Sequence, residues 1–214
     1  MVRELNRYVT ELTATTKEKA RIQSELDLAR QIQQSVLPRI YPPFPDRMEF
    51  DLFARTLPAR EVGGDFYDFF FVDKDHLGLV VADVSGKGVP AALFMTVART
   101  LIKNSSTHHA DPVRALSEVN AEIVPDNEMC MFVTVFYGVY ELSTGILRFV
   151  SAGHPSPLLR RADGSTTQLP KLRGMALGIV DDLDLEVGEV RLEVDDSLLA
   201  FTDVLEEEGN HQDE

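Results

Sequence analysis

The sequence is short of cysteine, of long apolar runs and of basic residues, and each shortage narrows what the chain can be. A single cysteine, Cys130, excludes a disulfide within the chain and a cysteine-rich zinc site. Its apolar neighbours predict a core position for it. No apolar run approaches the roughly 20 residues that span a bilayer, and the N-terminus lacks the apolar region of a signal peptide. We therefore expect a cytoplasmic chain without direct membrane contact.

Basic residues are outnumbered by acidic ones. The chain has 21 Lys and Arg against 35 Asp and Glu, for a formal net charge of −14. Nucleic acids and anionic membrane surfaces are bound by clustered Lys and Arg, so neither is predicted as a partner. With 214 residues, 44% of them hydrophobic, the chain is expected to form one globular domain with an appendage.

The appendage is at the N-terminus. Residues 3–37 contain neither Gly nor Pro, and Pro38 ends this pattern, which predicts one long helix. One heptad seam is formed by Leu5, Val9, Leu12 and Leu26. This seam favours a two-stranded coiled coil over residues 1–37, and the polar residues between Leu12 and Leu26 make it weak in the middle. The alternative is a helix that packs on its own domain through Ile22, Leu28, Ile32 and Val36.

The globular pattern follows a Pro-rich break at residues 38–46. Residues 48–56 alternate like a strand, and strands are also predicted at 65–72 and 77–84. Two helices are expected to begin at Pro90 and Pro112, the second capped by Asp111. The remainder to residue 203 is rich in β patterns. Together these elements predict an α+β domain over residues 38–204, followed by an acidic disordered tail at 205–214.

Two aspartates stand at the ends of the predicted hairpin. A three-residue loop at 73–75 places Val72 opposite His76 and, further along, Asp65 opposite Asp83. Facing residues have Cβ atoms about 4.5–5.5 Å apart, and two carboxylates so placed repel unless one is protonated or a cation lies between them. Mg²⁺ or Mn²⁺ would satisfy both. The alternative is a register displaced by one residue, with both acids as solvated strand ends.

Further features of the same region support a ligand site. Gly63-Gly64 and Gly86-Lys87-Gly88 flank the two acids, where the backbone must turn sharply or approach a ligand closely. A third acid, Asp203, ends the strand pattern that begins at residue 197. Three acids at strand ends could converge on a two-metal site that acts on a phosphoryl group.

Several motifs occur in a family order: "ELDLARQIQQSVLP", "PAREVGGDFYD", "VVADVSGKGVPAAL", "MFVTVFYGVYELSTGILRFVSAGHPSPLL" and "FTD". In this the chain resembles bacterial metal-dependent serine phosphatases of the SpoIIE/RsbU type, relatives of protein phosphatase 2C. The resemblance implies an α/β/β/α arrangement, a β-sandwich flanked by helices, with two Mn²⁺ or Mg²⁺ ions at one end. It also implies a substrate, phosphoserine on an anti-sigma-factor antagonist of the STAS class.

The resemblance assigns roles to individual residues. Asp65 is similar to a metal-binding acid, Asp83 to the acid that bridges two metals with the Val84 carbonyl as a further ligand, and Asp203 to a ligand of the second metal. The implied reaction is in-line attack by a metal-bound hydroxide.

Two further roles each have an alternative. Arg60 would hold the phosphate, or be an exposed loop arginine, and His154 would protonate the leaving alkoxide, or order a turn.

The two ends of the chain carry further expectations. The N-terminal helix resembles the linker that joins these phosphatases to an upstream sensor module and pairs them as homodimers. After Asp203 the family has a glycine, where this chain has Val204, and a later strand opening with two aspartates that is not found here. We therefore expect the C-terminal part of the fold to be missing and the second metal site to be weak or absent.

Two other functions stay open at this point. The departures after Asp203 allow a degenerate or truncated phosphatase fold that acts as a dimeric regulatory or binding module. "GGDF" at residues 63–66 also resembles the GGDEF signature of diguanylate cyclases, although Phe66 stands where that signature has a second acid.

Overall fold

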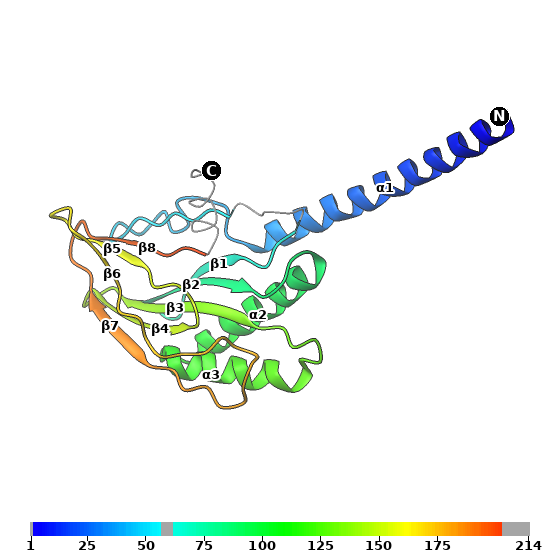
Figure 1. Ribbon diagram of the computed structural model, residues 1–214. Coiled ribbons are helices and arrows are strands. Elements are labelled where there is room, and N and C mark those ends of the chain that lie inside the picture. The colour runs from blue at the N-terminus through cyan, green and yellow to red at the C-terminus, as the bar shows by residue number, and fades with distance from the viewer. Residues whose placement is uncertain (1, 57–61, 203–214) are drawn as a thin grey trace, which may run out of the picture.

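The computed structural model describes residues 2–56 and 62–202, and its core is a pair of antiparallel sheets. The larger sheet has the order β1-β2-β3-β4-β7, and the smaller one β6-β5-β8 (Figure 1). The strands are β1 (Phe66–Phe71), β2 (His76–Val84), β3 (Val133–Glu141), β4 (Ile146–Ala152), β5 (Leu158–Arg160), β6 (Thr166–Gln168), β7 (Val187–Arg191) and β8 (Ser197–Leu199).

Helices α2 (Val89–His108) and α3 (Pro112–Ile123) cover one face of the larger sheet, and a short 3-10 turn, η1 (Val124–Asp126), follows α3 (Figure 1). The contact face of α2 is made of small and flexible apolar residues at helical spacing: Ala91, Met95, Ala98 and Ile102. All four are at most 1% exposed. Asp111 caps α3 as expected, since its carboxylate accepts hydrogen bonds from the backbone N–H groups of Val113 and Arg114.

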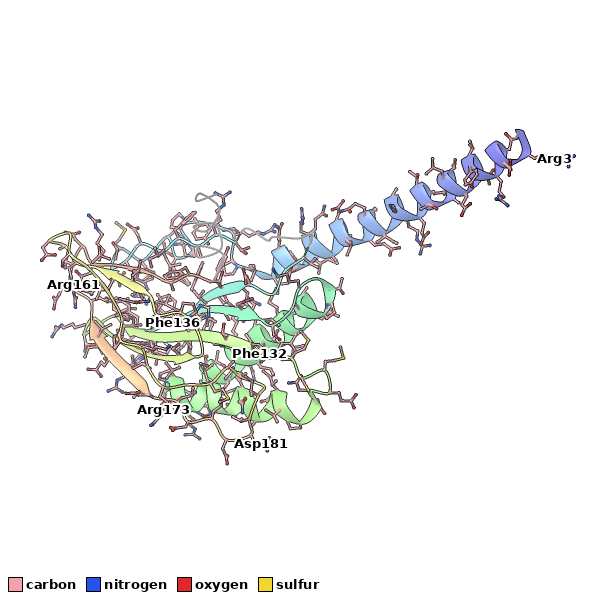
Figure 2. All side chains as sticks on the ribbon, viewed as in Figure 1. Arg3, Phe132, Phe136, Arg161, Arg173 and Asp181 are labelled. Carbon is pink, nitrogen blue, oxygen red and sulfur yellow. The ribbon has the colours of Figure 1, made fainter. Side chains whose placement is uncertain are left out.

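The other face of the larger sheet packs against the smaller sheet. Phe136 of β3 and Phe149 of β4 are buried between the two sheets, with Leu159 of β5, and Phe136 is labelled in Figure 2. The α+β sandwich predicted from the sequence is therefore confirmed. Of the four predicted layers, the described part of the chain forms three, α/β/β, and no helix of that part lies over the outer face of the smaller sheet.

Helix α1 (Val2–Val36) is one continuous helix that projects away from the sandwich (Figure 1). Ile22, Leu28 and Ile32 are 47–60% exposed and Val36 alone is half-buried, so the alternative in which these four pack on their own domain is wrong. Val9 and Leu12 of the heptad seam are also exposed, which leaves an apolar seam without cover within this chain. No helix in the described ranges is long and apolar enough to cross a membrane.

Two expectations fail in loops. Residues 48–56 form no strand, because the Ala54 N–H and C=O are both hydrogen-bonded to the Tyr41 hydroxyl, at 3.1 and 2.7 Å, rather than to a neighbouring strand. Cys130 is exposed rather than buried. It lies in a tight turn with a φ of 49°, where its N–H bonds the Asn127 carbonyl oxygen.

Candidate functional site

The β1–β2 hairpin has the register that the sequence predicts. Phe66 pairs with Ala82 and Phe71 with Leu77, and the Val72 N–H bonds the His76 carbonyl oxygen at 2.9 Å. One position beyond Phe66, this register sets Asp65 across from Asp83. Both aspartates are half-buried. The alternative register, displaced by one residue, is therefore wrong.

Glycine allows a close backbone approach beside this pair. A Cβ atom on Gly64 would lie 2.7 Å from the Val84 carbonyl oxygen, so only glycine fits here without displacing that strand. On the other side of Asp83, Gly86 and Gly88 have φ values of 84° and 81°, in the left-handed region that favours glycine. The expected sharp turning is confirmed at Gly86 and Gly88, whereas the close neighbour of Gly64 is the Val84 backbone.

The end of α1 holds the loop that precedes Asp65. The side-chain amide of Gln33 donates to the Gly63 carbonyl oxygen at 2.6 Å and accepts from the Gly63 N–H at 3.2 Å. This amide imitates a strand neighbour, because it satisfies both backbone groups of one residue. Gln33 is 9% exposed. Sequence reasoning missed this contact, since a glutamine near a helix end carries no pattern of its own.

The segment before Asp203 reaches the same place. The Thr202 hydroxyl donates to Asp65 Oδ2 at 3.3 Å. His154 is 7% exposed; its Nε2 lies 3.0 Å from the Phe201 carbonyl oxygen and its Nδ1 lies 2.9 Å from the hydroxyl of Thr134. Thr134 pairs with Asp83 across the sheet. His154 thus connects the strand beside Asp83 to the chain that leads into Asp203.

These contacts favour one of the two predicted roles of His154. Both ring nitrogens face groups of the protein, and its backbone N–H and C=O bond the Ser151 hydroxyl. These bonds agree with the turn-ordering alternative, and the proton-donor role stays a prediction. Arg60 and Asp203 lie outside the described residues. In residues 2–56 and 62–202, no group of three or more His, Cys, Asp or Glu side chains is placed to hold a metal ion.

The described ligands fit a hard divalent cation. Facing carboxylates provide anionic oxygen donors, and the Val84 carbonyl, which lies close to Gly64, would add a neutral one. Mg²⁺ and Mn²⁺ prefer such oxygen sets. The arrangement can therefore bind a cation that in turn binds an anionic group such as a phosphoryl group.

A buried ion pair lies on the opposite face of β1. Asp68, 2% exposed, contacts Arg99 of α2 at 2.7 Å between Oδ2 and the guanidinium, and Arg99 has 12% of its side chain exposed. Burial raises the pKa of the Asp68 carboxyl, and the charges of Arg99 and Lys103 oppose that rise. Alternation along β1 could have revealed this residue, because Asp68 shares a face with Phe66 and Phe70 of the core.

Comparison with known proteins identifies the family of the chain. The chain matches a family model described as Stage II sporulation protein E (SpoIIE) over residues 73–214. Phosphoserine phosphatase RsbU of Bacillus subtilis is 30% identical over 182 residues, which cover 85% of this chain and 53% of RsbU. Protein IcfG of Synechocystis is 30% identical over 206 residues, 84% of this chain and 32% of that protein. The chain thus spans between a third and about half of the length of these relatives.

A solved structure of a related phosphatase domain has a similar fold. The SiaA-PP2C domain of Pseudomonas aeruginosa superposes with a TM-score of 0.69 at 25% identity, over 86% of this chain and 73% of that one. The family match covers more than half of the sequence, from the loop of the β1–β2 hairpin onward. The chain belongs to the SpoIIE family, whose solved relatives have a PP2C-type phosphatase fold.

Proposed function

We propose that this chain is a metal-dependent protein-serine phosphatase. The observation that carries the proposal is the register of β1 and β2, which sets two half-buried carboxylates against each other next to the close contact of Gly64 with Val84. Membership of the SpoIIE family and the similarity to a phosphoserine phosphatase add support. A facing carboxylate pair has a physical reason to bind a cation.

Four residues would hold the ions, Mn²⁺ or Mg²⁺: Asp65, Asp83, Asp203 and Val84 through its carbonyl. Ions at such a site neutralise phosphoryl charge and lower the pKa of a water molecule. Other residues of the protein hold these ligands in position. The Thr202 hydroxyl fixes Asp65, and His154 holds Thr134 and Phe201, which keeps the strand paired with Asp83 next to the segment before Asp203. Arg60, five positions before Asp65, would bind the phosphate.

The substrate and partners follow from the family resemblance and are part of the proposal. The substrate would be a phosphorylated STAS-domain protein in the cytoplasm, and α1 would connect the domain to an upstream sensor module. The proposed domain boundaries are 1–37 for the linker helix, 38–204 for the phosphatase domain and 205–214 for an acidic tail.

Metal removal tests the activity. We expect the chain to release phosphate from p-nitrophenyl phosphate and from a phosphoserine STAS-domain protein in Mn²⁺, and to lose this activity in EDTA. Restored release on adding Mn²⁺ back would show that the chelator acts through the metal. If no phosphate is released although the chain binds the STAS-domain protein, it is a binding module rather than an enzyme.

The exposed seam of α1 predicts a dimer. Val9 and Leu12 are 56% and 70% exposed, and a partner helix would bury them in a coiled coil. We expect light scattering to give twice the chain mass for the intact protein and a single chain mass for Leu12→Arg. Ala14→Arg is the matched control, because residue 14 lies on the far side of the heptad from the seam. A monomeric parent chain would contradict the dimer.

A further inference from the structure

A hollow of about 280 Å³ lies where the end of α1 meets β1. Its walls come from the last turn of α1, from the loop after it and from Tyr67 of β1. Sites for whole small ligands usually measure about 300–1,000 Å³. This hollow is therefore sized for one or two side chains of another molecule.

The aromatic walls are fixed by hydrogen bonds within the protein. The Tyr67 hydroxyl donates to the Pro38 carbonyl oxygen at 2.8 Å, and the Tyr41 hydroxyl donates to the Ala54 carbonyl oxygen. The ring of Tyr41 also packs on Phe53, with 5.2 Å between ring centroids. Rigid walls lose little conformational entropy when a group binds between them.

The hollow is positively charged in a chain whose net charge is −14. Arg39 and Arg55 both line it, and no Asp or Glu among the described residues does. Arg39 donates one hydrogen bond to the side-chain oxygen of Gln34 at 2.7 Å, which orients its guanidinium. Arg55 has no hydrogen bond or ion pair to any described residue. Two guanidiniums with spare N–H donors favour a carboxylate.

The hollow is close to the paired aspartates. Tyr67 is two residues after Asp65 along β1, and side chains two apart in a strand share a face. At about 3.3 Å per residue, the separation along the strand is about 7 Å. A bound peptide in extended form would cover this distance in about two residues.

We propose that this hollow, with Arg39 and Arg55, receives an acidic side chain about two residues from the phosphoserine of the substrate protein. The inference rests on the proposed phosphatase function, because it takes the phosphoserine to be bound at Asp65 and Asp83. It adds a rule for substrate selection. The phosphatase would select a substrate by the charge of a side chain that lies near the phosphoserine but away from the reacting group.

Two heptapeptides test the selection rule. Both carry a central phosphoserine among alanines and a fluorescein label, with glutamate two residues to either side in one and glutamine in the other. We expect the glutamate peptide to have an about fivefold lower KM in Mn²⁺, the upper range for a solvent-accessible ion pair. Arg55→Ala should remove this preference. Arg55→Glu should reverse it toward a third peptide with lysine at those positions.

Arg114→Ala is the matched control, because Arg114 is exposed on α3, across the larger sheet from the hollow. This variant should keep the fivefold preference. Fluorescence anisotropy with the same peptides measures binding without turnover. Equal affinity of the parent chain for both peptides overturns the docking site. Preferred binding of the glutamate peptide without phosphate release supports the docking site and overturns the phosphatase function instead.

Discussion

Asp83→Asn is expected to lower Mn²⁺-dependent phosphate release by more than about 100-fold. Substituting a residue that only orients a metal ligand costs about 10- to 100-fold in activity, and the loss of a ligand itself should be at least as large. The side chain keeps its shape but loses its negative charge, and an amide is a poorer ligand for a hard cation than a carboxylate. Asp83 lies in β2 and pairs with Thr134 of the neighbouring strand β3. Because this pairing uses the backbone, the substitution should leave the backbone in place. Phosphate release from p-nitrophenyl phosphate at saturating Mn²⁺ measures the effect.

A second measurement separates loss of the metal from loss of the fold. In EDTA, Asp83→Asn should unfold at the same temperature as the parent chain or a higher one, because one of two facing like charges is removed. At Mn²⁺ one hundred times above its Kd, the parent chain should gain about 2.7 kcal/mol of stability, and the variant much less. Asp182→Asn, at an exposed turn, is the matched control. Full activity in Asp83→Asn would contradict the proposed centre.

The hairpin that carries this site could be predicted because its constraints are local. Apolar runs on both strands and a three-residue loop allow few registers, and a slip by one residue would send Asp68 to the other face of the sheet. The same reasoning located the starts of α2 and α3, where Pro90 and Pro112 stand in the first turn. Resemblance to a family then supplied the chemical role of the pair.

What could not be predicted depends on contacts between distant residues. Residues 48–56 alternate like a strand, but both backbone groups of Ala54 bond the Tyr41 hydroxyl, a tertiary contact that alternation cannot report. Cys130 has apolar neighbours in sequence, yet the turn at Asn127 directs it to solvent. The contact of the His154 ring likewise depends on Phe201, 47 positions later.

Asp68→Ala is expected to lower the free energy of unfolding by about 3–5 kcal/mol, the cost of leaving a buried charge without its partner. Arg99 would lose its only carboxylate contact among the described residues while 12% of its side chain is exposed, and the Phe69 N–H would lose its bond to Asp68 Oδ1. Urea unfolding followed by far-ultraviolet circular dichroism measures the change, because the chain has no tryptophan to report it. The m-value should stay constant, since the same surface is exposed on unfolding.

The double variant Asp68→Leu with Arg99→Met tests the reason for this loss. Burial raises the pKa of the Asp68 carboxyl even though Arg99 and Lys103 lower it, so the attraction does not fully offset the cost of burying the charge. Replacing both partners with apolar side chains should therefore be neutral or stabilising. A double variant as unstable as Asp68→Ala would instead mean that the ion pair itself holds β1 against α2. Lys103→Ala is the control, because it removes a neighbouring charge and leaves the Asp68–Arg99 contact in place.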